Sequence, residues 1–473
     1  MFVAREDERR QLIDAYESDR SQFVAIYARM RVGKTFLVRK TFNYTFTFQH
    51  TVIAKGTLSD QLFGFCASLK DAGLTGFEPP SNWLEAFELL KDLIRSSSGK
   101  RKPVFIDELS WMDTPRCDLM VALESFWNGW ASARKDIVLI VCASATSWML
   151  DKVIRNTGGL YHRLTAQISL KPFTLHECEE PARSLGITLS RHQLIECYMV
   201  LSGVPYYWAY LRKGLSLPQN IDAMFFAREA SLREEFDYLF SSLFRYPADY
   251  LAIVEALGTH KAGMTREEII ATTGLTDSGS LTKRLSNPEG CGFIRKHLPF
   301  GRNAKRALYQ LVDHFTLFVL RFLPHQVNDE RHWSNTGNTP ACNAWCGIAF
   351  ERVCMAHVPQ IKAALGVSGV ASNVSSWTCR ADPDKGTFGG QIDLLINRRD
   401  QVINLCEMKC SIGKYAITKK VDEGIRHKVS DLQLATKTKS SIHVTLVTPY
   451  GLTKNSDSGN VQAVITGDDL FRE

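Results

Sequence analysis

Strand-like and helix-like stretches alternate through the first 170 residues of the chain. Short, continuous apolar runs occupy residues 23–27, 102–106 and 136–143, and the stretches between them have the wider apolar spacing of amphipathic helices. Strands that alternate with helices predict a parallel sheet covered by helices, so the fold class expected for this part is α/β.

The pattern becomes mainly helical beyond residue 172, with a Gly-x-Pro break at residues 203–205. Three short helices are then expected over 248–257, 265–273 and 278–285, followed by a strand pair around residues 300–303. Three helices and a hairpin describe a winged helix-turn-helix, in which the third helix enters a DNA groove and the hairpin touches the backbone. A winged helix that serves only as a structural spacer is the alternative.

The last third of the chain begins with a polar stretch and then shows a second strand pattern. Residues 326–340 are polar and lack periodic apolar positions, which predicts a linker. Beyond it, the apolar runs 389–396 and 401–409 flank the turn 397–400, and this arrangement predicts a hairpin.

Composition adds limits on the class of protein. The 473 residues are 45% hydrophobic and 23% charged, which is ordinary for a globular protein and argues against disorder or a fibre. No apolar run approaches the ~20 residues that span a bilayer, and the charged start of the chain lacks a signal-peptide core. The twelve cysteines form no C-x-x-C pair and are expected as free thiols. We therefore expect a multidomain enzyme of the cytoplasm with no membrane partner.

A phosphate-binding pattern follows the first strand. The pattern G-x-x-x-x-G-K-[ST] is matched, except at its first glycine, by Ala28-Arg29-Met30-Arg31-Val32-Gly33-Lys34-Thr35. The backbone N–H groups of this loop would face the phosphates of ATP, Lys34 would reach the β and γ phosphates, and Thr35 would bind Mg²⁺. The alternative for an imperfect match is a basic, glycine-containing turn.

Polar residues at the ends of the next strands extend this candidate site. Asp107 would bind Mg²⁺ with Thr35, and Glu108 would orient the water that attacks the γ-phosphate, whereas in the alternative the two carboxylates only cap a helix. Ser144 ends another strand and is expected at the same sheet edge as a γ-phosphate sensor. Arg163 would approach the phosphates, unless it is an ordinary surface arginine.

Basic residues are concentrated in two segments, although the formal net charge is only +7. Residues 281–310 have a local excess of +6, and residues 409–440 have an excess of +5. Such patches are typical of proteins that bind a phosphate backbone, while a solvated basic face is the usual alternative. The candidate DNA-binding residues are Lys283, Arg284, Arg295, Lys296, Arg302, Lys305 and Arg306.

A second group of catalytic candidates lies in the expected carboxyl-terminal hairpin. Glu407 and Lys409 are two apart on a strand and share a face, and Asp393 can face them across the hairpin. Two such carboxylates can bind Mg²⁺ or Mn²⁺, and the lysine can orient or activate the attacking water. Glu351 would supply a third carboxylate from a helical stretch. A buried, purely structural Glu–Lys pair is the alternative.

With these residues in place, the chain resembles the archaeal-type ATPases of the STAND/AAA+ class that carry a carboxyl-terminal PD-(D/E)xK nuclease-like domain. The resemblance covers nearly the whole length and is carried by the residues 2–8, the phosphate loop, Asp107, Glu108, Ser144, Arg163, 203–205, 292–294, 309–315, Asp393, 407–409, 419–420 and 445–451. It implies a P-loop NTPase core with a parallel sheet (1–172), a helical lid (173–242), a winged helix-turn-helix (243–325), a linker (326–340) and a restriction-endonuclease-like α/β domain (341–473).

The chain departs from this family at Ala4, Ala28 and Ala143, where glycine is usual. Glycine permits positive φ and close backbone approach, so alanine at position 28 is expected to weaken nucleotide binding or to slow turnover. Because Lys34, Thr35, Asp107 and Glu108 are intact, we expect ATP binding with slow hydrolysis.

The function expected from the sequence is an ATP-regulated, DNA-binding nuclease with a metal-dependent cleavage site. The main alternative is a nucleotide-sensing DNA-binding or scaffold protein whose nuclease-like domain is inactive. An ATP-driven motor or chaperone, which would need a homo-oligomeric ring, is a third alternative. The expected partners are ATP and DNA, and a homo-oligomer is left open.

Overall fold

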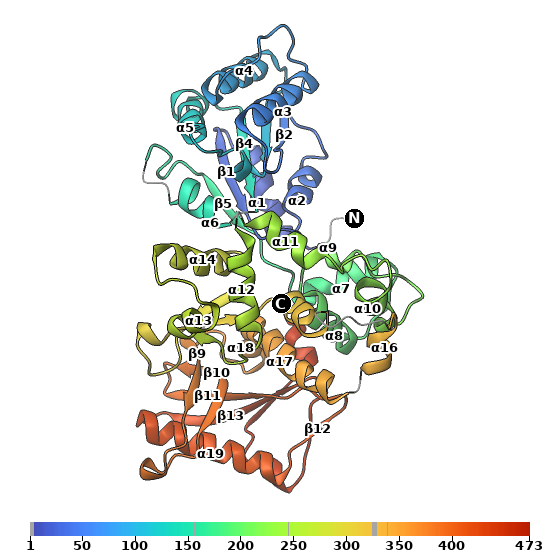
Figure 1. Cartoon of the computed structure of the whole chain (residues 1–473), viewed down its shortest axis with the longest axis vertical. Coiled ribbons are helices and arrows are strands. Elements are labelled where there is room, and N and C mark those ends of the chain that lie inside the picture. The colour runs from blue at the N-terminus through green and yellow to red at the C-terminus, as the bar shows by residue number, and fades with distance from the viewer. Residues whose placement is uncertain (1–3, 145, 156–157, 245, 324–328, 338) are drawn as a thin grey trace. The chain divides into compact units, whose positions relative to one another are not determined.

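The computed structural model describes most of the chain, namely residues 4–144, 146–155, 158–244, 246–323, 329–337 and 339–473. Phe2 and Val3, which begin the family-like opening, lie outside these ranges. The chain divides into two compact units, unit 1 (Met1–Lys171) and unit 2 (Pro172–Glu473). The ribbon of unit 1 runs from blue to teal in Figure 1.

Unit 1 is a five-stranded parallel sheet, with the strand order β2-β3-β4-β1-β5. This confirms the α/β class expected for the first part of the chain. Its helices and strands are α1 (Glu6–Glu17), β1 (Gln22–Tyr27), α2 (Lys34–Thr41), β2 (Phe48–Thr51), α3 (Leu58–Asp71), α4 (Trp83–Ser96), β3 (Lys102–Asp107), α5 (Leu119–Gly129), β4 (Ile137–Ala143), α6 (Thr146–Trp148) with a π-helical turn (Met149–Ile154), and β5 (Ala166–Ser169).

Alternate residues of β1 face the two helical layers of unit 1. Phe23 and Ala25 pack with α3, α4 and α5, whereas Val24 and Ile26 pack with α1 and α2, because successive strand side chains point to opposite faces. Every residue of β3 and β4 is buried, as expected for strands covered on both sides. The carboxyl ends of β1, β3 and β4 lie at one edge of the sheet, where ligands of open parallel sheets bind.

Unit 2 contains a helical first part, a small antiparallel sheet and a five-stranded mixed sheet. Its helices and strands are α7 (Leu175–Ser184), α8 (Arg191–Leu201), α9 (Pro205–Trp208), α10 (Leu217–Phe225), α11 (Glu235–Leu243), α12 (Pro247–Gly258), β6 (Met264–Thr265), α13 (Arg266–Thr273), α14 (Gly279–Gly290), β7 (Ile294–His297), β8 (Leu308–Leu311), α15 (His314–Phe322), α16 (His332–Thr336), α17 (Pro340–Ala356), α18 (Val358–Ala364), β9 (Ser372–Cys379), β10 (Gly390–Arg398), β11 (Val402–Met408), β12 (Tyr415–Ala416), α19 (Lys419–Thr436), β13 (Ser441–Thr448), β14 (Leu452–Thr453) and β15 (Ala463–Thr466).

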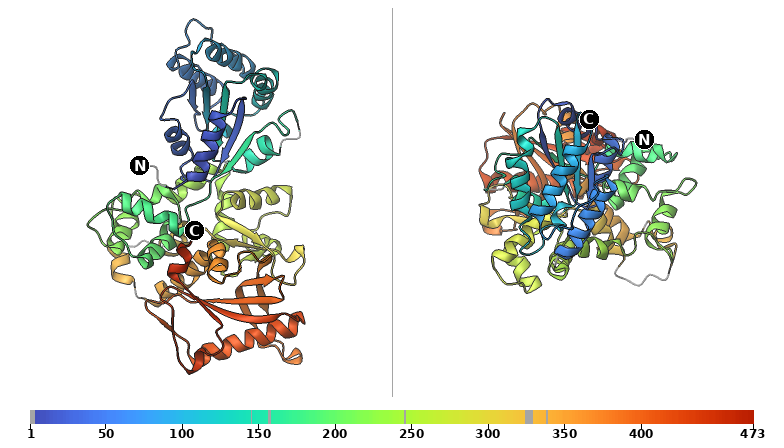
Figure 2. Two further views of the ribbon diagram at one scale, coloured as in Figure 1. Left: turned by 180° about the vertical axis from the view of Figure 1, so that it is seen from behind. Right: turned by 90° about the horizontal axis from the view of Figure 1, so that it is seen from above.

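The larger sheet of unit 2 has the order β15-β13-β11-β10-β9. Strands β9, β10 and β11 are antiparallel, and β11, β13 and β15 are parallel. The hairpin expected around the turn 397–400 is present as β10 and β11. Helix α17 contacts β11, and α19 contacts β10 and β9; Figure 2 shows α19, in red-orange, running along the sheet. The winged-helix and nuclease-like assignments, and the boundaries within unit 2, stay predictions.

Many helices of the chain begin where the sequence supplies reciprocal capping. In each, a Ser or Thr hydroxyl accepts the backbone N–H three residues later, and that residue's side chain accepts the N–H of the cap. These capped helices are α3, α7, α8, α10 and α13. Within the described residues, no helix has both the length and the apolar character needed to cross a bilayer. None of the twelve cysteines forms a disulfide in the described structure.

The segment 326–340, expected to be a polar linker, contains the short helix α16. Asp222 of α10 accepts the backbone N–H groups of Trp333 at 2.7 Å and Ser334 at 3.2 Å, as well as the Ser334 hydroxyl. The Trp333 indole is buried against the rings of Phe318, Phe322 and Trp345. The local polarity of this segment did not reveal the helix because its partners lie in distant parts of the sequence.

His357 connects the end of α17 to the start of α7. Its Nε2 accepts the backbone N–H of Leu175 at 2.9 Å, and its Nδ1 lies 2.8 Å from the Val353 carbonyl. We assign the proton to Nδ1 from these two partners. Burial lowers the pKa of His357 from 6.5 to about 4, so the ring is neutral at pH 7.

We expect His357→Leu to lower the free energy of unfolding by about 1–3 kcal/mol, because the buried N–H of Leu175 loses its acceptor. The pKa of His357 is lower in the folded chain, so its stabilisation is complete above pH 6.5 and is lost as the pH falls towards 4. Urea unfolding at several pH values should therefore show a flatter acid dependence in the variant. The partly exposed His176 provides the control His176→Leu; equal curves for His357→Leu and the wild type would contradict this role.

Candidate functional site

The loop between β1 and α2 brings Lys34 to the carboxyl edge of the unit 1 sheet. Gly33, with φ 94°, is the N-cap of α2. Lys34 is only 4% exposed. Its Nζ donates to Ser144 Oγ at 2.7 Å and to the carbonyls of Ala28 at 3.2 Å and Arg29 at 3.4 Å. The ammonium group is thus held by the loop on one side and by the end of β4 on the other.

Glu108 belongs to the same network. The Ser144 backbone N–H donates to Glu108 Oε2 at 2.8 Å, and the Ser144 hydroxyl donates to Glu108 Oε1. Lys34 Nζ lies 3.7 Å from Glu108 Oε1. Glu108 has a left-handed backbone, with φ 58°, which costs a non-glycine residue about 1–2 kcal/mol. Strain of this kind is concentrated at functional sites.

Thr35 and Asp107 form a second contact beside this network. The Thr35 hydroxyl donates to Asp107 Oδ2 at 2.6 Å. Asp107 is 2% exposed, and burial raises the pKa of its carboxyl above the ordinary value. Its Oδ1 is buried and has no hydrogen-bond partner among the described residues. Because a hydroxyl and a buried carboxylate with a spare oxygen are hard-cation ligands, these residues fit Mg²⁺.

Ala28 does not have the backbone conformation that favours glycine. Its φ is not positive, whereas Ala4, the other family glycine position near the start, has φ 53°. Ala28 is 4% exposed and packs in the same apolar cluster as Val32 and Leu37. The residues of the loop with positive φ are Arg31, with φ 72°, and Gly33, with φ 94°. The expectation that position 28 needs glycine for a positive φ is therefore wrong.

Arg163 lies apart from this network. It is exposed in the turn after Leu160, whose carbonyl accepts the Arg163 backbone N–H at 3.1 Å. No hydrogen bond or ion pair joins its side chain to Lys34, Ser144 or Glu108 in the described part of the chain. Its role as a phosphate contact stays a prediction.

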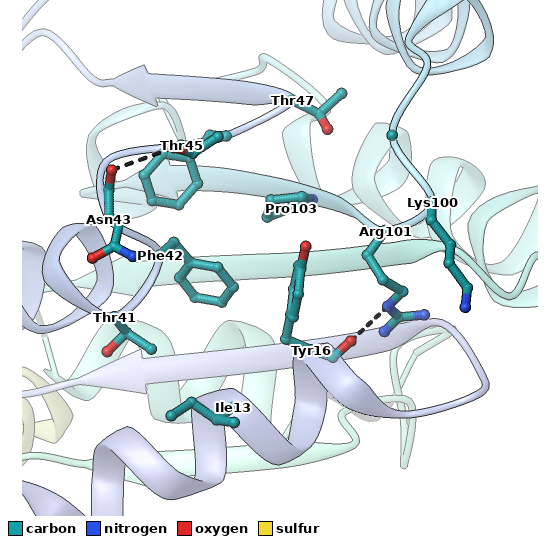
Figure 3. Close-up of a pocket in the computed structure, with 12 residues that line it drawn as sticks. Ile13, Tyr16, Thr41, Phe42, Asn43, Thr45, Thr47, Lys100, Arg101 and Pro103 are labelled. Carbon is teal, nitrogen blue, oxygen red and sulfur yellow. Dashed lines mark hydrogen bonds between the residues drawn. The ribbon is translucent and has the colours of Figure 1, made fainter.

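A cavity of about 670 Å³ opens at the amino edge of the same sheet, away from the loop of Lys34 (Figure 3). Its wall includes Thr47 before β2 and Pro103 at the start of β3, together with Tyr16 and Phe42. Arg101 donates to the Tyr16 carbonyl at 2.7 Å and the Ala15 carbonyl at 2.9 Å, so it fixes the end of α1. This hollow contains none of the motif residues.

The second candidate site gathers carboxylates from three elements of unit 2. Glu351 comes from α17, Asp393 from β10 and Glu407 from β11. Lys409 Nζ lies 2.8 Å from Glu407 Oε1, and Nζ of Lys428 from α19 lies 2.7 Å from Glu407 Oε2. Sequence reasoning missed Lys428, because a lysine in an amphipathic helix carries no motif that points to a distant strand.

Lys261 is a further cation that the sequence did not disclose. Its Nζ lies 2.6 Å from Glu351 Oε1 and 3.7 Å from Asp393 Oδ2. Gln391 Nε2 also donates to Asp393 Oδ1 at 2.5 Å. Three carboxylates therefore face three ammonium groups. Within the described residues, no three His, Cys, Asp or Glu side chains are arranged to hold a metal ion. Carboxylate oxygens are suitable ligands for Mg²⁺ or Mn²⁺, but here the same oxygens pair with lysine ammonium groups.

The pKa values of this cluster reflect burial and ion pairing. Burial and the charge of Asp393 raise the pKa of Glu351 to about 7. Burial alone would raise the pKa of Glu407, but Lys428 and Lys409 outweigh it and lower that pKa below its ordinary value. Burial alone would lower the pKa of Lys409, but Glu407 raises it. Lys409 therefore stays protonated at neutral pH and acts as a cation rather than as a base.

The candidate DNA-binding residues differ in how accessible they are. Arg284 pairs with Asp249 at 2.7 Å. Arg295 donates from Nε and Nη2 to Gln310 at 2.9 and 2.6 Å, and burial lowers its pKa to about 10. The exposed members of the set are Lys283, Lys296, Arg302, Lys305 and Arg306.

The hairpin that carries part of this basic set rests on the larger sheet of unit 2. The Phe300 backbone N–H donates to the Ser376 carbonyl of β9 at 2.7 Å, and His297 Nε2 lies 3.0 Å from the Ser376 hydroxyl. Phe300 also packs against the core cluster of that sheet. The hairpin is thus anchored at the end of β7 and at the start of the connection to β8, and its exposed cations follow in that connection at Arg302, Lys305 and Arg306.

Comparison with known proteins gives one curated relative along nearly the whole chain. No family model matches. The uncharacterized protein MJECL04 of Methanocaldococcus jannaschii is 25% identical over 443 residues, which are 90% of this chain and 92% of that protein.

Three solved structures show a remote similarity to this chain. The Walker-type ATPase PABY2304 of Pyrococcus abyssi is 17% identical, covers 68% of this chain and 96% of its own, and has a TM-score of 0.48. The ORC2 protein of Aeropyrum pernix, in complexes with ADPNP and ADP, is 14% identical, with coverages of 67% and 93% and a TM-score of 0.41. Cdc6p of Pyrobaculum aerophilum is 12% identical, with coverages of 67% and 93% and a TM-score of 0.35. TM-scores below 0.5 are too low to carry an argument about function.

We expect Ala28→Gly to change the dissociation constant for ATP by no more than about threefold, because Ala28 has no positive φ to relieve. The same substitution should lower the free energy of unfolding by about 0.5–1 kcal/mol, since glycine adds backbone freedom to the unfolded chain. Calorimetric titration with ATP and Mg²⁺, followed by urea unfolding, measures both. A tenfold or greater gain in affinity would show that the Ala28 methyl group obstructs the phosphates.

Proposed function

We propose that unit 1 binds ATP with Mg²⁺ and hydrolyses it slowly. The observation that carries this proposal is the buried Lys34 ammonium, which is held by Ser144 and by two loop carbonyls beside the Thr35–Asp107 pair. Burying an ammonium group costs free energy unless negatively charged groups or hydrogen-bond acceptors surround it. The phosphate oxygens of ATP are stronger acceptors for this ammonium group than carbonyls or a hydroxyl.

The roles of the remaining residues follow from their contacts. Thr35 and Asp107 would hold Mg²⁺, which supplies positive charge to the phosphates when bound. Ser144 would turn its hydroxyl towards the γ-phosphate and thereby loosen its bond to Glu108. Glu108 would then be free to orient water. Slow hydrolysis follows because Glu108 is tied by the backbone N–H and the hydroxyl of Ser144 until that change occurs.

For unit 2 we propose contact with DNA and metal-dependent cleavage of its phosphodiester bonds. The exposed cations at Arg302, Lys305 and Arg306 support backbone contact. Glu351 interacts electrostatically with both Asp393 and Lys409, and Lys409 pairs with Glu407. This grouping supports a hydrolytic centre, in which Lys409 stays a cation and stabilises developing negative charge. Nucleotide state in unit 1 would control this activity.

A scaffold protein without nuclease activity is the second candidate function. The observation that favours it is the pairing of all three carboxylates with lysines, Glu351 and Asp393 with Lys261 and Glu407 with Lys409 and Lys428. Such a network neutralises the buried carboxylates without any metal, as a structural ion-pair cluster does.

In unit 1, Lys34→Ala should weaken ATP binding by about 10- to 100-fold, because a charge-assisted contact to phosphate is lost. Glu108→Gln should leave binding nearly unchanged and slow phosphate release by about 100-fold, since it removes only the water-orienting carboxylate. Calorimetry with Mg²⁺ and ATP, and a phosphate-release assay, separate the two effects. Lys40→Ala, in the last turn of α2, is the matched control. Undiminished binding by Lys34→Ala would refute the proposed site.

In unit 2, the wild type should nick or linearise plasmid DNA in Mg²⁺ or Mn²⁺, and Lys409→Ala should reduce the rate by about 100-fold or more. Lys439→Ala, an exposed lysine in the same basic segment, is the control and should cut at the wild-type rate. Cleavage that survives Lys409→Ala would reject the site assignment. A wild type that binds ATP but never cuts DNA would favour the scaffold.

A further inference from the structure

Lys261 lies in a turn whose backbone is firmly held. Its carbonyl accepts Arg352 Nη2 at 2.6 Å and Gln310 Nε2 at 2.7 Å. The turn closes through the bond from the Gly263 backbone N–H to the His260 carbonyl at 3.0 Å. Gly263 has φ 90°, and a Cβ there would lie 2.5 Å from the Tyr309 carbonyl oxygen. The root of the Lys261 side chain is therefore fixed beside the carboxylate cluster.

The free end of this side chain reaches between two candidate metal ligands. Its ammonium group lies 2.6 Å from Glu351 Oε1 and 3.7 Å from Asp393 Oδ2, and so bridges α17 and β10. Glu351 is 6% exposed, and its Oε2 is buried with no hydrogen-bond partner in the described part of the chain. One oxygen of this carboxylate thus pairs with the lysine and the other has no partner, so Lys261 compensates the buried carboxylate only in part.

The Lys261 ammonium group can move away from the carboxylates more easily than the guanidinium group of the neighbouring Arg352. The Lys261 side chain is 42% exposed, so its ammonium can turn into water without a large desolvation cost. Arg352 is buried and donates to the carbonyls of Leu311 and Lys261, which ties it to the fold. Of these two cations, Lys261 is the one that can exchange with a cation from solution while the backbone stays in place.

We propose that Lys261 is a built-in competitor for the metal side of the unit 2 site, so that a divalent cation binds Glu351 and Asp393 only when the Lys261 ammonium is displaced. This inference rests on the proposed function of unit 2 and deepens it by naming how the site is held inactive. Both cations need the same oxygens, and a carboxylate that pairs at 2.6 Å with an ammonium group cannot offer that oxygen to a metal at the same time.

The competing explanation is that Lys261 only neutralises two buried carboxylates. The two accounts differ in what happens when the charge is removed. If Lys261 is only structural, its removal destabilises the fold and leaves the affinity for metal unchanged. If Lys261 competes with metal, its removal frees two carboxylates that repel each other, and a divalent cation restores both the balance of charge and the stability.

The test is calorimetric titration of the full chain with MnCl₂, without nucleotide or DNA. Mn²⁺ binding at the unit 2 site is defined as the binding that is lost in Asp393→Asn. This definition separates it from any Mn²⁺ binding at Asp107. Lys261→Met should bind Mn²⁺ at this site at least about tenfold more tightly than the wild type, as expected when one competing ion pair is removed. Lys261→Arg keeps the charge and should resemble the wild type. Lys362→Met, in α18, is the matched control.

Thermal unfolding supplies a second readout. Mn²⁺ should raise the melting temperature of Lys261→Met more than that of the wild type, and the added effect should vanish in Lys261→Met/Asp393→Asn. If Lys261→Met does not fold, Lys261→Gln replaces it. Equal, Asp393-dependent affinities in the wild type and Lys261→Met would overturn the competition while leaving the metal site standing. Absence of any Asp393-dependent binding in either protein would overturn both the competition and the proposed cleavage site.

Discussion

A buried ammonium group must exchange water for protein acceptors, and this requirement shapes the centre of unit 1. Lys34 is almost inaccessible to solvent, yet its hydrogen-bond acceptors are a serine hydroxyl and two backbone carbonyls, and the Glu108 carboxylate lies 3.7 Å from its Nζ. The parallel sheet places them there, because the loop leaves β1 and Ser144 follows β4, its direct neighbour. A polyanion would complete what this arrangement lacks. The same serine restrains Glu108, so in the proposed function phosphate binding and release of the Glu108 carboxylate would be coupled through one side chain.

In unit 2 the buried groups are carboxylates, and lysines neutralise their charge. Lys261, Lys409 and Lys428 reach the cluster from a turn, a strand end and a helix. Two of these cations surround Glu407, whereas Lys261 lies on the side of Glu351 and Asp393. The lysine expected from the E-x-K pattern is therefore only one of three. In the proposal made above the cluster is a metal centre that Lys261 keeps closed, and the side chain that would have to leave is 42% exposed on a fixed turn.

The sequence predicted the position of residues whose pattern lies within one short segment. The phosphate loop, Asp107–Glu108 and Ser144 could be placed together because parallel strands end at one edge, and the β10–β11 hairpin followed from two apolar runs around a polar turn. It failed where contacts join distant segments. The helix α16 depends on Asp222, more than a hundred residues away, and Lys261 and Lys428 carry no local signal. The expected need for glycine at position 28 was too strong, since a sequence pattern records residue type but not φ. The sequence also did not show that Arg284 pairs with Asp249 and that Arg295 donates to Gln310.

The central claim is that the loop 28–35, the end of β3 and Ser144 form one nucleotide site. Hydrogen exchange followed by mass spectrometry, with and without Mg²⁺ and ATP, tests this most directly because it locates binding along the chain. The account predicts slower exchange on nucleotide addition in the peptides that cover residues 28–37, 105–110 and 142–144, with no comparable change at the Thr47–Pro103 cavity. Unchanged exchange in those three segments under saturating nucleotide, or protection confined to the cavity at the opposite edge, would contradict it.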